Sequence, residues 1–306
     1  MARSSLLGLA TVLAVSTVVA CSTRSSAVPA VSADAASDAG PSPIGGDRPV
    51  TVHVPPSYVD GTPMPLLILL HGYSASGALQ ELYFDFTPLS DARGFLYAHP
   101  DGTLDSSNNR FWNATNACCD LYGSSVDDSS YLSHLVTEIS ARYTVDPKRV
   151  FFVGHSNGGF MAYRMACDHG DQIAAIASLA GAMWLDVTKC PAAVPVAVLE
   201  IHGTADEVIL YDGGAIEGGG AYPGAATTVT DWVTIDGCAT TPDTSSPPLD
   251  LTLPPGNDTT VIKYAAGCNP GGHAELWTID GGPHIPPPST SLSPDILDFL
   301  FAHPKP

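Results

Sequence analysis

The clearest chemical pattern in the chain is Gly154-His155-Ser156-Asn157-Gly158. It lies between an apolar run, residues 149–153, and a segment with helical spacing, residues 158–167. A serine on a sharp strand-to-helix turn exposes its hydroxyl, and the flanking glycines allow neighbouring backbone to approach closely. The pattern therefore predicts that Ser156 is a nucleophile. It also predicts that the Asn157 N–H, at the helix start, stabilises an oxyanion.

A serine hydroxyl needs a base that takes its proton and a carboxylate that orients the base. Asp206 comes shortly after an apolar run, residues 194–201, and His284 follows another, residues 275–279, through a flexible Asp-Gly-Gly-Pro loop. The order serine, acid, histidine is the one associated with this kind of turn. We therefore predict that Asp206 is the acid and His284 the base.

Other histidines and acids near these positions have simpler interpretations. His273 is the alternative base, although it precedes the last predicted strand. Glu207 lies one step further into its loop than Asp206, so it is the less suitable acid. His71 and His202 each precede a glycine at a strand end. We expect them to orient loops through hydrogen bonds.

An oxyanion hole needs a second backbone donor from a loop early in the fold. Tyr73 closely follows the apolar run 65–70, and its N–H is the predicted second donor. Trp112 and Trp184 lie in segments near the expected mouth of the site, where they are predicted to bind substrate. Packing is the alternative role for both tryptophans.

Asp127 and Asp128 precede a helical pattern. We interpret them as a helix cap and a loop brace, not as metal ligands. The cysteines and histidines show no zinc-site spacing. We therefore predict no metal and no cofactor.

Apolar runs and helical patterns alternate from Arg48 onward, which predicts an α/β fold with a mostly parallel central sheet and helices on both faces. The predicted strands are residues 50–54, 65–70, 94–98, 149–153, 173–179, 194–201 and 275–279. The predicted helices are residues 130–143, 158–167 and 294–301. Longer irregular stretches, expected to form the walls of a cleft, are residues 101–125, 211–226 and 240–257.

The N-terminus predicts export. Arg3 precedes an apolar run, residues 6–19, that is short for a permanent membrane anchor, so residues 1–20 are interpreted as a signal peptide. The sequence Val18-Val19-Ala20-Cys21 resembles a bacterial lipobox, which makes Cys21 the predicted lipidation site of a cell-envelope lipoprotein. Ordinary cleavage followed by secretion is the alternative.

The rest of the chain divides into two parts. Residues 21–46, rich in Ser, Ala, Pro, Asp and Gly, predict a flexible tether, and residues 47–306 predict one catalytic domain. The 12 Lys and Arg against 31 Asp and Glu give a net charge of −19, which argues against a nucleic-acid partner. We expect a monomer that contacts a membrane only through its lipid anchor and whose partner is an ester substrate.

Setting Cys21 aside leaves six cysteines, an even number that suits disulfides in an oxidising compartment. The predicted pairs are Cys167 with Cys190, Cys238 with Cys268, and Cys118 with Cys119. Each of the first two is worth about 3–4 kcal/mol in the chain-entropy model. The alternatives are that the adjacent pair is free or that the connectivity differs.

The chain resembles the polyhydroxybutyrate depolymerase and feruloyl esterase family of α/β-hydrolases, in particular its lipoprotein esterases. The resemblance extends over about residues 48–303 and rests on residues 70–73, 99–102, 112–115, 118–119, 126–128, 154–161, 180–181, 202–206 and 277–282 with His284. It implies a serine esterase that acts, through an acyl-enzyme, on feruloyl or acetyl esters of plant polysaccharide or on hydroxyalkanoate polyesters.

The chain departs from this family in two ways. Ile285-Pro286-Pro287-Pro288 replaces a Trp-Pro pair common after the histidine, which changes the expected substrate-facing wall. No polymer-binding domain is appended, which favours soluble or oligomeric esters. A peptidase on the same fold and a non-catalytic surface lipoprotein are the alternative functions. The ordered serine, aspartate and histidine argue against the second of these.

Overall fold

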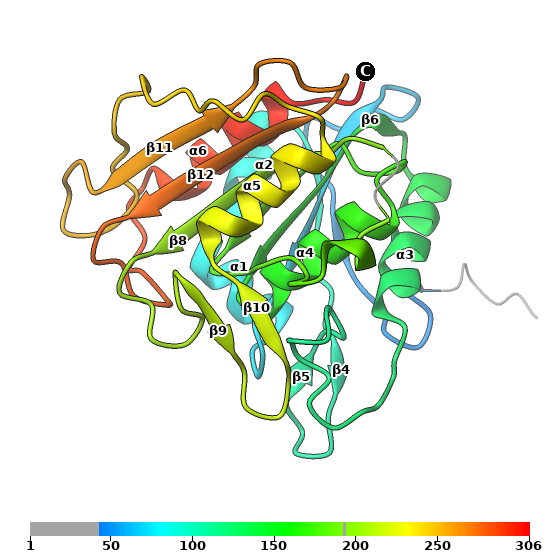
Figure 1. The fold of residues 1–306 in the computed structure, drawn as a ribbon. Coiled ribbons are helices and arrows are strands. Elements are labelled where there is room, and N and C mark those ends of the chain that lie inside the picture. The colour runs from blue at the N-terminus through cyan, green and yellow to red at the C-terminus, as the bar shows by residue number, and fades with distance from the viewer. Residues whose placement is uncertain (1–42, 192–193) are drawn as a thin grey trace, which may run out of the picture. The chain divides into compact units, whose positions relative to one another are not determined.

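The computed structural model describes residues 43–191 and 194–306. Its central feature is an eight-stranded sheet with the order β1-β3-β2-β6-β7-β8-β12-β11 (Figure 1). The six inner strands run parallel, and β1 and β11 pair antiparallel at the two edges. The predicted mostly parallel sheet is therefore confirmed. The predicted signal peptide, Cys21 and most of the predicted tether lie outside the described residues.

The strands of this sheet are β1 (Val52–His53), β2 (Met64–Leu70), β3 (Leu96–Ala98), β6 (Val145–His155), β7 (Ala175–Leu179), β8 (Ala197–Gly203), β11 (Thr259–Tyr264) and β12 (His273–Ile279). Two small hairpins add β4 (Thr103–Leu104) with β5 (Arg110–Phe111), and β9 (Gly213–Ala215) with β10 (Ala221–Pro223). The helices are α1 (Gly77–Phe84), α2 (Phe86–Arg93), α3 (Asp128–Arg142), α4 (Asn157–Asp168), α5 (Ala225–Ile235) and α6 (Leu292–Ala302).

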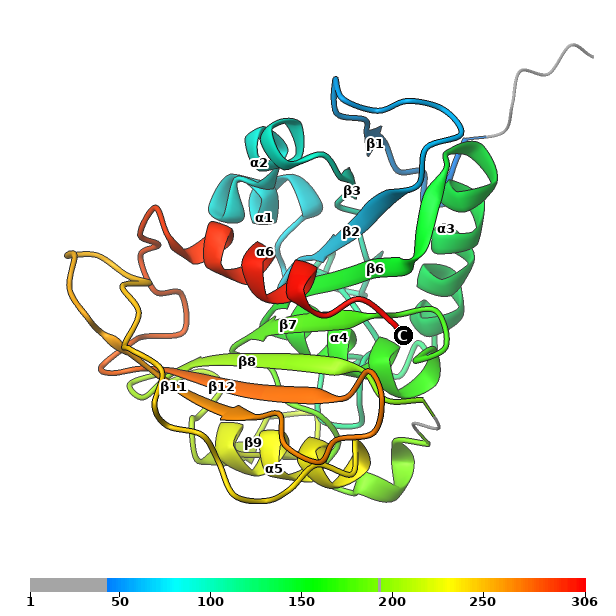
Figure 2. The same ribbon diagram turned by 90° about the horizontal axis from the view of Figure 1, so that it is seen from above.

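Helices cover both faces of the sheet, which explains why its inner strands are continuous apolar runs. Every residue of β2 is buried. Leu66, Ile68 and Leu70 pack on one face, whereas Leu67 and Leu69 pack on the other. Figure 2 shows α3, α4 and α5 on the first side, with α1, α2 and α6 on the second. The predicted two-sided helical cover is confirmed.

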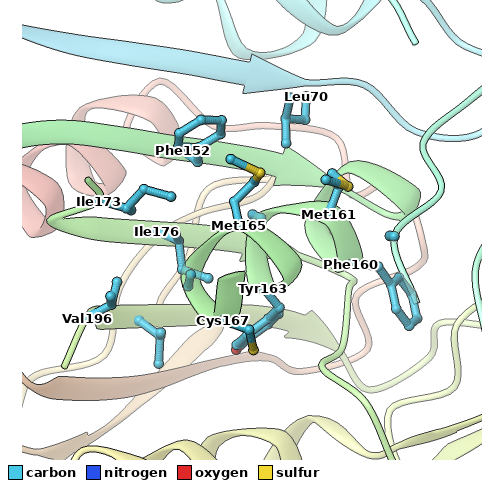
Figure 3. Close-up of a cluster of buried hydrophobic side chains, with 14 of the residues drawn as sticks. Leu70, Phe152, Phe160, Met161, Tyr163, Met165, Cys167, Ile173, Ile176 and Val196 are labelled. Carbon is cyan, nitrogen blue, oxygen red and sulfur yellow. The ribbon is translucent and has the colours of Figure 1, made fainter. Parts of the chain in front are cut away.

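Helix α4 packs closely against the sheet. Met161 and Met165 point from it toward the sheet, where Phe152 and Ile176 lie (Figure 3). All four side chains are fully buried. Because interiors are packed as densely as organic crystals, α4 has little freedom to shift, and the turn that precedes it is held in place.

Three disulfides join Cys118 to Cys119, Cys167 to Cys190, and Cys238 to Cys268, as predicted. The second bridge links the C-terminal turn of α4 to the segment that leads into β8. The bridge thus lies at the end of α4 opposite Ser156. In the part of the chain that the structure describes, no helix has the length and apolarity needed to cross a bilayer.

Candidate active site

Ser156 occupies a sharp turn between β6 and α4. Its backbone has φ 54° and ψ −121°, a conformation that residues other than glycine rarely adopt. The two glycines of the motif are needed for close packing. A Cβ at Gly154 would lie 2.1 Å from the Gly158 carbonyl oxygen, and one at Gly158 would lie 2.2 Å from the Leu70 carbonyl oxygen. The local geometry therefore has the strained strand-to-helix form that the motif predicts.

Asp206 and His284 are hydrogen-bonded to each other, with 2.8 Å between His284 Nδ1 and Asp206 Oδ2. Asp206 lies just after β8 and is buried, and its other carboxylate oxygen accepts from the N–H groups of Val208 and Ile209. Burial raises the pKa of this carboxyl. Hydrogen bonds from His202 and His284 outweigh that effect, so the pKa lies well below its usual value. Asp206 is therefore ionised where it contacts His284.

Two side chains that the sequence analysis did not single out hold the loop after His284. His155 donates from Nε2 to the His284 carbonyl oxygen at 2.9 Å, and the two rings lie 4.9 Å apart. Burial lowers the pKa of His155 to about 4, so this donor is a neutral imidazole. Tyr83 donates from its hydroxyl to the Pro286 carbonyl oxygen at 2.7 Å. The place of His155 inside the Gly-x-Ser-x-Gly motif was the signal available for finding it.

Ser156 and His284 line the same cavity, which has a volume of about 610 Å³. The alternative base, His273, lies elsewhere. It begins β12, so it lies near the amino end of a parallel strand, whereas Ser156 follows the carboxyl end of β6. Its ring contacts His303 at 4.1 Å. The alternative acid, Glu207, is exposed. The structure thus brings together the three residues predicted as nucleophile, acid and base.

The loop that carries Tyr73 abuts Ser156, because a Cβ at Gly72 would lie 3.4 Å from the Ser156 Cβ. The Gly102 N–H donates to His71 Nε2 at 2.9 Å, so His71 carries its proton on Nδ1 and donates it to the Gly72 carbonyl oxygen at 2.8 Å. In a trans peptide the carbonyl and the following N–H point in opposite directions. The Tyr73 N–H therefore points away from His71, and Tyr73 itself lines the cavity. The loop-orienting role predicted for His71 is confirmed.

Asn157 is locked in place by its side chain. Its Oδ1 accepts from the Trp112 N–H at 2.7 Å, and its Nδ2 donates to the Trp112 carbonyl oxygen at 2.9 Å. The Trp112 indole donates to the His71 carbonyl oxygen at 3.1 Å. Trp112 therefore connects the two segments that carry the predicted oxyanion donors.

Neither predicted substrate-binding tryptophan lines the cavity beside Ser156. Trp112 is fully buried. Trp184 is 7% exposed, and the Arg164 guanidinium lies 5.7 Å from the centre of its ring. The structure places both in packing positions, the alternative role, because each ring is covered by neighbouring side chains.

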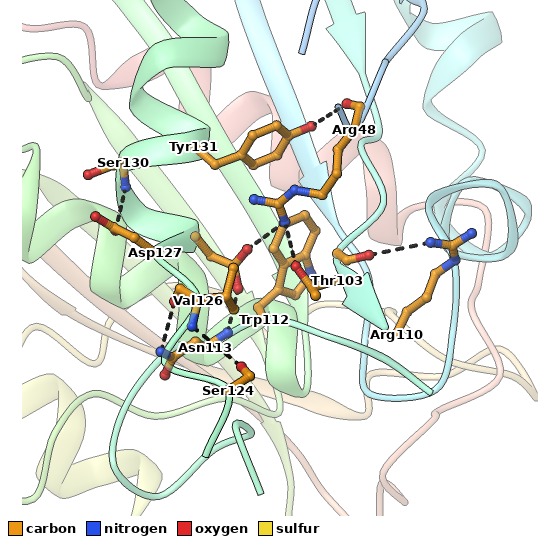
Figure 4. Close-up of polar contacts among 12 residues, drawn as sticks. Arg48, Thr103, Arg110, Trp112, Asn113, Ser124, Val126, Asp127, Ser130 and Tyr131 are labelled. Atoms are coloured by element: carbon orange, nitrogen blue, oxygen red, sulfur yellow. Dashed lines mark hydrogen bonds and ion pairs between the residues drawn. The ribbon is translucent and has the colours of Figure 1, made fainter. Parts of the chain in front are cut away.

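The acidic pair at the start of α3 has the predicted structural role (Figure 4). Asp127 caps the helix by accepting from the Ser130 N–H at 3.0 Å. Asp128 accepts from the Asn113 N–H at 2.7 Å and pairs with Arg48 at 2.5 Å, which braces the loop before the helix. Within residues 43–191 and 194–306, no group of three or more His, Cys, Asp and Glu side chains is arranged to hold a metal ion.

Comparison with known proteins finds several esterases. Feruloyl esterase B of Piromyces equi is 29% identical over 244 residues, which is 78% of this chain and 42% of that protein. Feruloyl esterase D of Neurospora crassa is 26% identical over 259 residues, which is 79% of this chain and 75% of that protein. The chain therefore spans less than half the length of the Piromyces protein.

Among solved structures, the acetyl xylan esterase from Aspergillus awamori matches with a TM-score of 0.60 and 14% identity, over 84% of this chain and 96% of that one. This similarity concerns the fold, and it supports the predicted α/β-hydrolase architecture. The model of the Esterase family, described as "Putative esterase", matches residues 42–215, more than half of the chain. The chain therefore belongs to the Esterase family.

Proposed function

We propose that this protein is an exported serine carboxylic-ester hydrolase in which Ser156 is the nucleophile, His284 the base and Asp206 the acid. The observation that carries the proposal is the 2.8 Å hydrogen bond between His284 and Asp206, beside a cavity that Ser156 and His284 share. The strained turn at Ser156 supports the same assignment. Membership of the Esterase family supports the reaction class.

The hydrogen bonds of His284 indicate how the reaction proceeds. Its Nδ1 is held by Asp206, which leaves Nε2 for the proton of the Ser156 hydroxyl. The serine oxygen attacks the ester carbonyl, and the N–H groups of Tyr73 and Asn157 stabilise the oxyanion. Collapse of the intermediate releases the alcohol, which takes the proton from His284. Water then hydrolyses the acyl-enzyme by the same steps in reverse, with His284 again acting as base.

The apolar cavity favours a bulky acyl group. Its walls include Leu79, Leu82, Val208 and Ile285, which are 56%, 79%, 60% and 60% exposed. Apolar side chains left in water around a cleft mark a ligand site. Feruloyl esters and hydroxyalkanoate esters present an acyl group of this kind, whereas an acetyl group would leave most of the cavity empty. The two related feruloyl esterases support the aryl alternative.

A panel of chromogenic feruloyl, hydroxybutyryl, butyryl and acetyl esters, with matched amides, tests the function and the acyl preference together. We expect higher kcat/KM for the bulky acyl esters than for acetyl esters, and no amide hydrolysis. Replacing the exposed cavity residue Leu82 by glutamine should lower kcat/KM for the bulky esters about tenfold, because apolar contact is lost. Acetyl esters should be little affected.

Leu104→Gln is the matched control, because Leu104 is 50% exposed and lies in β4, outside the cavity lining. Equal losses in both variants would contradict the proposed acyl site. Efficient cleavage of the amides would favour the peptidase alternative. A protein that hydrolyses neither class would be a binding protein with an esterase fold.

We also propose that the protein acts outside the cytoplasm, anchored through a lipid on Cys21. The three disulfides support an oxidising compartment, and the lipobox-like sequence before Cys21 supports lipidation. Mass spectrometry of the N-terminal peptide from native cells should find acylated Cys21, and Cys21→Ser should release the protein from membranes. An unmodified Cys21 or cleavage at another residue would contradict the lipoprotein proposal and favour ordinary secretion.

A further inference from the structure

A second buried acid–histidine pair lies directly behind Asp206. Glu200 and His202 are two residues apart on β8, so their side chains extend from the same face of the sheet. His202 Nδ1 lies 3.1 Å from Glu200 Oε1, and the side chains are 1% and 0% exposed. The mechanism described above does not use either residue. A titratable pair at the centre of a sheet is costly unless its charges are balanced.

His202 reaches the same carboxylate oxygen as the proposed base. Asp206 Oδ2 lies 2.8 Å from His284 Nδ1 and 3.4 Å from His202 Nε2. His202 Nε2 also lies 2.8 Å from the Ile209 carbonyl oxygen, which accepts its proton. Both ring nitrogens of His202 therefore face acceptors. This arrangement suits a doubly protonated, positively charged ring between two carboxylates.

We propose that His202, held by Glu200, is a positioning residue that shares the Asp206 carboxylate with His284 and thereby sets the lower pH limit of catalysis. This inference rests on the function proposed above. A carboxylate beside His284 stabilises the protonated form of that ring. A positive charge on His202, on the far side of Asp206, offsets part of this stabilisation. His284 can then act as a neutral base at lower pH than it would beside an unshared carboxylate.

The electrostatics of His202 agree with this arrangement. Burial lowers the pKa of His202, but hydrogen bonds to Asp206 and Glu200 outweigh it and raise the pKa to about 10. Burial raises the pKa of Glu200 above its usual value, and the hydrogen bond and positive charge of His202 offset only part of that rise. The other titratable groups facing this cluster are His155 at the end of β6, Tyr163 on α4, Tyr211 after β8, Tyr222 on β10 and His284 after β12.

Glu200→Gln tests the charge and preserves the shape. The amide can still accept at His202 Nδ1 or donate to it, but it no longer stabilises the imidazolium, so His202 becomes neutral at working pH. We expect the acid limb of the kcat/KM profile to move to higher pH by about one unit. The alkaline plateau should stay within a few-fold of the wild-type value. A purely structural role would instead lower kcat/KM equally at every pH.

Glu275→Gln is the matched control. Glu275 is also buried on a strand and also pairs with a histidine two residues away, with 2.9 Å between Glu275 Oε1 and His273 Nε2. That histidine lies at the opposite end of β12 from the loop carrying His284. We expect Glu275→Gln to leave the acid limb unchanged. His202→Gln, which removes the ring itself, should move the limb in the same direction as Glu200→Gln.

A measurement on the unaltered protein covers the case in which both variants misfold. Histidine ¹⁵N NMR should find both ring nitrogens of His202 protonated at pH 8, and a neutral tautomer there would overturn the inference. An unmoved acid limb in folded Glu200→Gln and His202→Gln would overturn it as well. Neither result touches the proposed function, which fails only if Ser156 does not react with a fluorophosphonate and esters are not cleaved.

Discussion

Ser156→Ala is expected to lower kcat for ester hydrolysis by about 10⁴–10⁶-fold, because the proposed triad acts as a unit and only oxyanion stabilisation and binding remain. The same variant should no longer react with a fluorophosphonate probe, since the probe needs the serine oxygen. Burst kinetics and intact-mass spectrometry of the labelled protein measure the two effects. The fold should survive, because the backbone at residue 156 is already held at φ 54° by the packing of α4.

Ser125→Ala controls for changing a serine in a left-handed backbone conformation. Ser125 has φ 56°, is exposed and does not line the cavity. It should keep wild-type activity and labelling. Full activity of folded Ser156→Ala would show that hydrolysis proceeds at another site. The proposed mechanism would then be wrong.

His284→Ala is expected to cause a loss in kcat of about 10⁴–10⁶-fold as well, since Ser156 then loses the histidine that Asp206 orients. Combining it with Ser156→Ala should lower activity little further, because removing one member of such a unit already removes its action. Asp206→Asn should cost about 10⁴-fold. Steady-state kinetics of the three single variants and the double variant, with thermal unfolding to check the fold, make this comparison.

His273→Ala is the control that separates the two histidines. His273 packs against His303 and Phe299 at the other end of β12, so its loss should affect stability and leave kcat within a few-fold. If His273→Ala were inactive and His284→Ala remained active, the base would be misassigned.

Some features of the protein are encoded locally and were predictable for that reason. The turn at Ser156 depends on the glycines at positions 154 and 158. Any side chain there would place its Cβ within about 2 Å of a backbone carbonyl oxygen. Strands such as β2 can be recognised as unbroken apolar runs, because both of their faces are covered. The helical spacing of residues 130–143 similarly indicated α3 (Asp128–Arg142).

Short helices carried too little periodicity to be recognised. The helices α1 and α2 have eight residues each and meet at Asp85, whose left-handed backbone (φ 54°) interrupts the pattern. Strand β11 was not predicted, because it lies at the edge of the sheet. Several of its residues are half-exposed there, so its sequence is not a continuous apolar run.

The sequence by itself determined the nucleophile turn, the order of the proposed triad, the even number of cysteines beyond Cys21 and the alternation that builds a parallel sheet. These features depend on neighbouring residues along the chain or, for the cysteines, on their even number. Only the tertiary structure decided which histidine accompanies Ser156, because parallel strands carry His284 to one end of the sheet and His273 to the other. It alone buried Trp112 beneath the loop that carries Tyr73 and placed His202 against Asp206. Such contacts join residues through packing across strands, which no spacing along the chain encodes.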